Sequence, residues 1–191
     1  MDRRKALRNI GKGIGTVIVT PTIVSIFQRC QLSKTFNPTF FKAEDFNLIS
    51  RLMEIIIPKT DIPGAIELKL PDFVDNYIDA VWDKKSKENI NKSLKFFKYV
   101  AKIKFGQKPT RNLTTDELDK LLHKFLKNKD IYSDEEKIAA SFTAELRNLT
   151  INAFRTNEYI GENVLAYQPV PGINVGCVDL DEATGGKAWS L

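Results

Sequence analysis

Apolar residues recur along this chain at helical spacing, and this periodicity limits the fold more than any other feature of the sequence. Before residue 160 no segment of useful length alternates apolar and polar residues as a half-buried strand would. The 191 residues, 42% of them hydrophobic, are enough for one domain with a buried core. We therefore predict an all-α fold, a single bundle of about five helices over residues 31–160.

Each predicted helix has an apolar row and a residue type that favours its boundary, such as proline, glycine or a capping box. In chain order the boundary residues are Pro58 after the first helix, Pro71 at the start of the second, Ser86 and Gly106 at the ends of the third, and Thr114–Glu117 and Ser133–Glu136 before the last two. The predicted buried rows are Phe46, Ile49, Leu52, Met53 and Ile56; Phe73, Val74, Tyr77, Ile78 and Val81; Ile90, Leu94, Phe97, Val100 and Ala101; Leu118, Leu121, Leu122 and Phe125; and Ile138, Phe142, Leu146, Leu149 and Ala153.

The helical period ends near residue 160. Residues 161–191 are rich in Asn, Gly, Pro and Val, and we predict a long irregular, extended C-terminal tail that is either disordered or laid over a surface. The tail is too apolar for a simple solvated segment, so we expect it to pack on the bundle or on a partner. The candidate partner contacts are Tyr167, Pro169, Pro171, Gly172 and Trp189.

The positive charge of the chain is concentrated in residues 1–30, called the leader below. Six of the 29 basic residues and one of the 24 acidic residues lie there, so the remainder carries 23 of each. A nucleic-acid-binding domain usually carries its excess positive charge in the folded part, so we expect no nucleic-acid partner.

Arg3 and Arg4, followed by Lys5, two apolar residues and a further basic residue, resemble a twin-arginine export signal. A modestly apolar stretch follows at 14–27, too short and polar for a membrane span but typical of a secretory leader. We therefore expect a periplasmic protein, the alternative being a basic amphipathic helix on a cytoplasmic one. Three fates of the leader stay open: cleavage, lipidation at Cys30 despite the unfavourable Arg29 before it, and retention as an inner-membrane anchor.

Few residues suited to catalysis or metal binding are present. A single histidine, His123, and two distant cysteines, Cys30 and Cys177, argue against a zinc cluster or a histidine-based triad. His123 lies off its apolar row and is predicted to be exposed. Cys30 and Cys177 are candidates for a disulfide in an oxidising compartment.

Two clusters of charged residues can be interpreted either as functional sites or as solvated helix faces. Asp72, Asp75 and Asp79 share a helix face, where we predict solvated carboxylates rather than an acid–base pair. Lys95, Lys98 and Lys102 likewise share a face, which is either solvated or a docking surface for an acidic partner or anionic lipid.

The connector between the first two helices is the most distinctive motif. It runs Pro58-Lys59-Thr60-Asp61-Ile62-Pro63-Gly64-Ala65. The Pro63-Gly64 order favours a type II turn, which requires positive φ at the glycine. Asp61 is predicted to hydrogen-bond backbone N–H groups near Pro63 and Gly64.

This motif, preceded by Leu52–Ile57 and followed by a Pro71-Asp72-Phe73-Val74-Asp75 helix start, resembles the N-terminal signature of the gluconate 2-dehydrogenase subunit 3 family. The segment Tyr167–Cys177 is similar to the closing Pro-Gly segment of that family, and a twin-arginine leader is also typical of it.

The resemblance implies a non-catalytic small subunit of a membrane-associated dehydrogenase complex. Its partners would be a large flavoprotein subunit that holds FAD and oxidises a sugar or sugar acid, with or without a cytochrome c subunit. The small subunit itself would bind no cofactor and would help the large one mature and cross the membrane. Two other hypotheses stay open: a free-standing periplasmic helical binding protein, and an enzyme that uses the carboxylates of the body.

Overall fold

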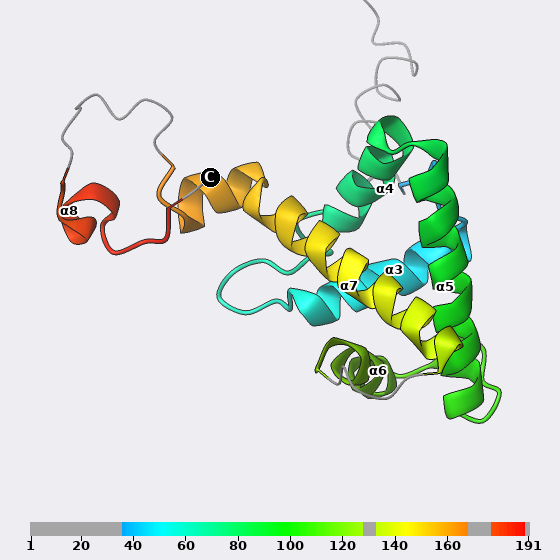
Figure 1. Ribbon diagram of the computed structural model, residues 1–191. Coiled ribbons are helices and arrows are strands. Elements are labelled where there is room, and N and C mark those ends of the chain that lie inside the picture. The colour runs from blue at the N-terminus through cyan, green and yellow to red at the C-terminus, as the bar shows by residue number, and fades with distance from the viewer. Residues whose placement is uncertain (1–35, 128–132, 168–176, 190–191) are drawn as a thin grey trace, which may run out of the picture. The chain divides into compact units, whose positions relative to one another are not determined.

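The computed structural model describes residues 36–127, 133–167 and 177–189, and these ranges are mainly helical (Figure 1). The long helices are α3 (Ala43–Ile56), α4 (Leu70–Val81), α5 (Lys84–Lys104), α6 (Thr115–Lys127) and α7 (Asp134–Arg155). Shorter elements are the 3-10 turn η1 (Thr110–Asn112), the π-helical turn η2 (Ile160–Val164) and α8 (Leu180–Thr184). The prediction of an all-α bundle of about five helices is confirmed.

Helix α7 lies at the centre of the bundle and packs against α3, α4, α5 and α6, most extensively against α5 (Figure 1). Phe97 of α5 lies between two other rings, 5.3 Å from Phe142 of α7 and 6.2 Å from Phe125 of α6, measured between centroids. Phe97 and Phe142 are fully buried, so truncating either to alanine would cost roughly 3–5 kcal/mol. The aromatic contact therefore joins three of the helices through one core.

The helix starts differ in part from the predicted caps. Thr114 and Glu117 form the predicted capping box, with Thr114 N–H donating to Glu117 Oε2 at 2.8 Å and Glu117 N–H donating to Thr114 Oγ1 at 3.2 Å. At the start of α7 only half of the box forms: Ser133 Oγ accepts from Glu136 N–H at 3.3 Å, but the Glu136 carboxylate binds the ammonium of Lys124 on α6 instead. The ion pair to a neighbouring helix replaces the local cap.

The third helix begins earlier than predicted. Asp83 caps it by accepting from Ser86 N–H at 2.7 Å, so Ser86 is the donor and not the cap. The predicted stop at Gly106 is confirmed, since Gly106 has φ 67° and Gln107 N–H closes the end of α5 on Lys102 C=O at 2.8 Å.

The tail contains more regular structure than its composition suggested. Asp179 caps the short helix α8, and Gly185 ends it with φ 63°. Ala166 N–H donates to Ala188 C=O at 2.8 Å, and Lys187 Nζ donates to Asn163 C=O at 3.2 Å. These two bonds join the described part of the tail to the segment that follows α7.

Several predictions concern residues outside the described ranges. Arg3, Arg4, Cys30 and the whole 1–30 leader lie outside them, so the export signal and the fate of the leader stay predictions. Cys177 is exposed, and its pairing with Cys30 likewise stays a prediction. Within the described ranges, no helix has the length and apolar character needed to cross a membrane.

Candidate functional site

The connector between α3 and α4 is a closed turn held by its own backbone. Ala65 N–H donates to Ile57 C=O at 3.0 Å, which brings the two ends of the motif together. Leu70 N–H then donates to Ala65 C=O at 3.0 Å, and so the turn leads directly into α4. Ala65 is fully buried, whereas Pro58 and Thr60 are exposed. The motif therefore sets how the first two helices of the described body meet.

Gly64 is required for space and not for its φ angle. The glycines with positive φ in the described ranges are Gly106, Gly185 and Gly186, so the predicted positive φ at Gly64 is wrong. A Cβ on Gly64 would collide with Glu54 Oε1 and would lie 2.8 Å from the backbone nitrogen of Lys59. Only a residue without a side chain allows α3 and the turn to approach this closely.

Glu54 and Thr60 hold the connector, and the sequence pattern did not point to either role. Glu54 Oε2 on α3 accepts from Ile66 N–H at 2.8 Å, which links the helix to the far side of the turn. Thr60 Oγ1 accepts from Ile62 N–H at 3.3 Å, whereas Asp61, the residue predicted to stabilise the turn, is exposed. In a sequence, this arrangement would be indicated by a glycine at position 64 together with a hydrogen-bond acceptor side chain at position 54.

Asp75 is the clearest departure from the predicted solvated face. It is fully buried, and its carboxylate accepts from the N–H groups of Thr39 at 2.6 Å, Phe40 at 3.2 Å and Phe41 at 2.8 Å. The Thr39 hydroxyl donates to it as well, at 3.0 Å. Residues 39–41 and the Asp75 carboxylate are called the Asp75 latch below. The latch satisfies a buried charge through backbone donors, and so its role in this structure is to fix the chain before α3 onto α4.

The other two carboxylates of the predicted face have different surroundings. Asp79 is exposed and pairs with Lys87 Nζ at 3.3 Å. Asp72 is half-buried, and its partial burial raises the pKa of this carboxyl above its usual value. The three residues therefore do not form one acid–base constellation.

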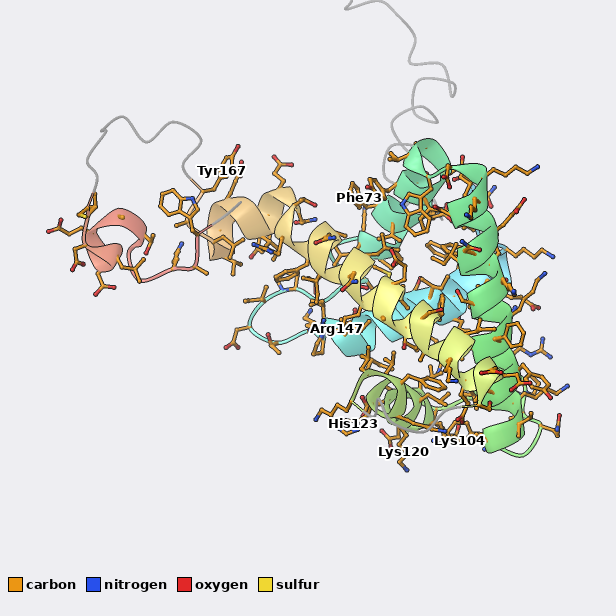
Figure 2. The ribbon with its side chains drawn as sticks, in the orientation of Figure 1. Phe73, Lys104, Lys120, His123, Arg147 and Tyr167 are labelled. Carbon is orange, nitrogen blue, oxygen red and sulfur yellow. The ribbon has the colours of Figure 1, made fainter. Side chains whose placement is uncertain are left out.

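The predicted buried row of α4 is divided between two faces, and the buried Asp75 lies on the same face as Val74 and Ile78. Val74 and Ile78 are buried as predicted, but Phe73, Tyr77 and Val81 are 51%, 39% and 61% exposed. The rings of Phe73 and Tyr77 stack, with centroids 6.0 Å apart and planes 16° apart. Phe73 projects outward from α4 in Figure 2. We call Phe73, Tyr77 and Val81 the α4 row.

A groove adjoins the end of the α4 row. It has a volume of about 560 Å³ and lies where the α4–α5 junction meets α7. Its lining residues are Val81, Trp82, Asp83, Ser86, Asn89, Ile90, Ser93, Ser141 and Glu145. The charged residues in this lining are both acidic, and the hydrogen bond from Ser86 N–H lowers the pKa of Asp83. The groove thus combines an indole ring, hydroxyl and amide groups and negative charge.

The lysine-rich face of α5 is partly neutralised by other helices. Lys98 pairs with Asp45 of α3. Lys108, which follows the end of α5, pairs with Glu117 of α6 at 3.0 Å. Lys95 and Lys102 are exposed. Pairing of some lysines and exposure of others fits a solvated face better than a dedicated docking surface.

The remaining candidate residues are His123 on α6 and the residues of the C-terminal tail, which lie far from the α4 row in the sequence. His123 is exposed on α6, as predicted, and is labelled with Lys104 and Lys120 in Figure 2. Burial and the nearby charges of Lys124 and Lys120 lower the pKa of Lys104. Tyr167 and Trp189 are about half exposed, whereas Pro169, Pro171 and Gly172 lie outside the described residues.

Within the described parts of the chain, no group of three or more His, Cys, Asp or Glu residues is arranged to hold a metal ion. A comparison with family models matches residues 43–172 to the family described as Gluconate 2-dehydrogenase subunit 3. Searches of curated proteins and of solved structures found no match. The matched range spans more than half of the chain and contains the connector, the Asp75 carboxylate and the α4 row.

Proposed function

Because this chain belongs to the gluconate 2-dehydrogenase subunit 3 family, we propose that it is the non-catalytic small subunit of a periplasmic, flavin-dependent dehydrogenase complex. Its partner is a large flavoprotein of the glucose-methanol-choline type, which holds FAD and oxidises a sugar or sugar acid. A cytochrome c subunit completes the complex in one version of the proposal. The family match over residues 43–172 is the observation that carries this proposal.

The geometry supports a scaffolding role for the family motif. The buried and charged groups of the motif region are engaged in holding the fold: Glu54 binds the turn, and Asp75 binds the chain ahead of α3. A general acid or base instead needs a carboxyl group that can reach a substrate. The proposal therefore assigns the motif to the shape of the subunit and the chemistry to the partner.

The leader supplies the second part of the proposal, which is export. The chain escorts its flavoprotein through the twin-arginine route, because Arg3 and Arg4 form the paired signal and that route carries folded cargo. Membrane-surface association through the leader is a further element of this proposal.

The experiment follows two proteins at once. The chain is co-expressed with the flavoprotein encoded in the same genome, and both are assayed in periplasmic and cytoplasmic fractions. We expect the flavoprotein, identified by its bound flavin, to co-purify with the chain. Arg3→Lys together with Arg4→Lys should leave both proteins in the cytoplasm.

The matched control is Arg8→Lys together with Arg29→Lys, which keeps the same leader charge but leaves the pair intact. Periplasmic recovery of the Arg3/Arg4 variant at the level of this control would contradict export through the pair. A chain that reaches the periplasm and never binds the flavoprotein would instead favour the alternative, a free-standing periplasmic helical binding protein.

A further inference from the structure

Helix α4 departs from the usual distribution of side chains between core and solvent at Asp75, Phe73 and Tyr77. It buries the carboxylate of Asp75 completely and leaves the rings of Phe73 and Tyr77 51% and 39% exposed. Burying a charged group is unfavourable unless it is well hydrogen-bonded, and a partly exposed aromatic ring gives up part of the free energy of its burial. The Asp75 latch offsets the first cost with bonds from three backbone N–H groups and a hydroxyl.

The latch and the core contacts of α4 together leave the Phe73, Tyr77 and Val81 face exposed. Leu70, Val74 and Ile78 lie in the core, on the same side as Asp75. The α4 row follows an i, i+4, i+8 spacing, which places its members next to one another along the helix surface. The stacked rings of Phe73 and Tyr77 form a preorganised apolar platform, since each restricts the other.

The charges beside this platform define what fits it. Val81 belongs both to the α4 row and to the lining of the adjoining groove, so the two surfaces are continuous. The groove presents the carboxyl groups of Asp83 and Glu145, with no basic residue in its lining. A complementary segment would carry apolar side chains for the platform and a lysine or arginine for the groove.

We propose that the α4 row and the adjoining acidic groove bind the flavoprotein partner, through a partner segment in which apolar side chains are followed by a lysine or arginine. This inference rests on the proposed function, because it names the surface with which the small subunit makes its complex. Aromatic residues near the centre of an interface commonly provide most of its binding free energy.

The test measures the dissociation constant between the purified chain and the purified flavoprotein. Phe73→Ser together with Tyr77→Ser should weaken binding at least about 30-fold. The control is Tyr99→Ser together with Ile103→Ser, a pair on α5 with the same spacing and similar exposure, 55% and 54%. We expect the control to bind within about threefold of the parent, since neither residue belongs to the proposed surface.

A second variant tests the groove independently of the rings. Glu145→Lys should weaken binding roughly tenfold and make it less sensitive to added salt, because one attractive charge pair becomes repulsive. Asp119→Lys, an exposed charge reversal on α6, is the matched control and should leave binding unchanged. Circular dichroism and the melting temperature of every variant show that it is folded.

Each outcome decides the proposal. A folded Phe73/Tyr77 variant that binds the flavoprotein as tightly as the control overturns it, even though the proposed function stands. The proposal is also overturned if the Phe73/Tyr77 variant keeps its flavoprotein binding but loses self-association or binding to anionic vesicles. The surface then serves a second copy of the chain or a membrane. If the parent chain itself fails to bind the flavoprotein, the proposed function fails and this inference fails with it.

Discussion

Replacing Asp75 by asparagine tests whether the latch holds the fold together. The amide keeps the size of the carboxylate but has one acceptor oxygen, and its NH2 group would face donors that are already in place. Hydrogen bonds to a charged group contribute about 1.5–3 kcal/mol each, and a buried donor without a partner costs about 1–3 kcal/mol. Phe41 N–H lies in the buried part of the latch, 2.8 Å from Asp75 Oδ1.

We expect Asp75→Asn to lower the free energy of unfolding by about 3 kcal/mol, less than the sum of the separate bonds because these contributions are not additive. In a domain of this size each kcal/mol shifts the melting temperature by about 2–4 °C, so the expected decrease is about 6–12 °C. Denaturant unfolding followed by helical circular dichroism gives the free energy directly.

The control is Asp79→Asn, four residues further along α4. Asp79 is exposed and makes one surface ion pair, with Lys87, so its loss should cost less than about 1 kcal/mol. Equal stability of the two variants would refute the reasoning, because it would mean that the four bonds to Asp75 contribute no more than a solvated ion pair.

Three further predictions concern other parts of the chain. Gly64→Val should cost about 1–3 kcal/mol through collision with Glu54 and the Lys59 backbone, measured by denaturant unfolding, and a parent-like value would show that the turn can open. Acidification below about pH 4 should lower the melting temperature, because hydrogen bonds from Ser86 N–H and Thr114 N–H hold the pKa values of Asp83 and Glu117 below their unfolded values. That contribution is present at neutral pH and lost as the pH falls through the folded pKa values, so Glu117→Gln should flatten the profile. Deleting residues 162–191 should preserve helical circular dichroism, since the described hydrophobic core cluster ends at Ala153, while weakening partner binding; loss of the helical signal would place the tail in the core.

The positions of the helices could be read from the sequence because their signals are local. Proline after α3, the capping box before α6 and glycine after α5 act within one turn of the residues they affect. A backbone group that needs a partner at a helix end finds it in the nearest suitable side chain, so spacing alone identifies it.

The register of α4 could not be read in this way. Its sequence contains two apolar rows at helical spacing, one through Val74 and Ile78 and the other through Phe73 and Tyr77, and periodicity does not rank them. The row through Val74 and Ile78 is buried together with Asp75, whose backbone donors at Thr39 and Phe41 lie more than thirty residues earlier in the chain. An interaction of that sequence separation leaves no local pattern.

Gly64 shows a second limit of the pattern. The Pro-Gly order was interpreted through the φ preference of turns, which is a property of the turn itself. The actual constraint is the space around the absent Cβ, which the backbone nitrogen of Lys59 and the side chain of Glu54 occupy. The need for a glycine at position 64 was predicted correctly, but the physical reason for it was not.

The Asp75 latch also joins two distant points of the chain, so that the residues between them form a closed loop. Between Phe41 and Asp75 lie the whole of α3, the connector and the start of α4, and both ends of this stretch are held by hydrogen bonds that do not pass through the connector. The exposed peptide bonds at Pro58–Asp61 are therefore redundant for retaining α3. A protease that cuts there would leave a nicked but assembled subunit, with two fragments that stay together until the protein is denatured.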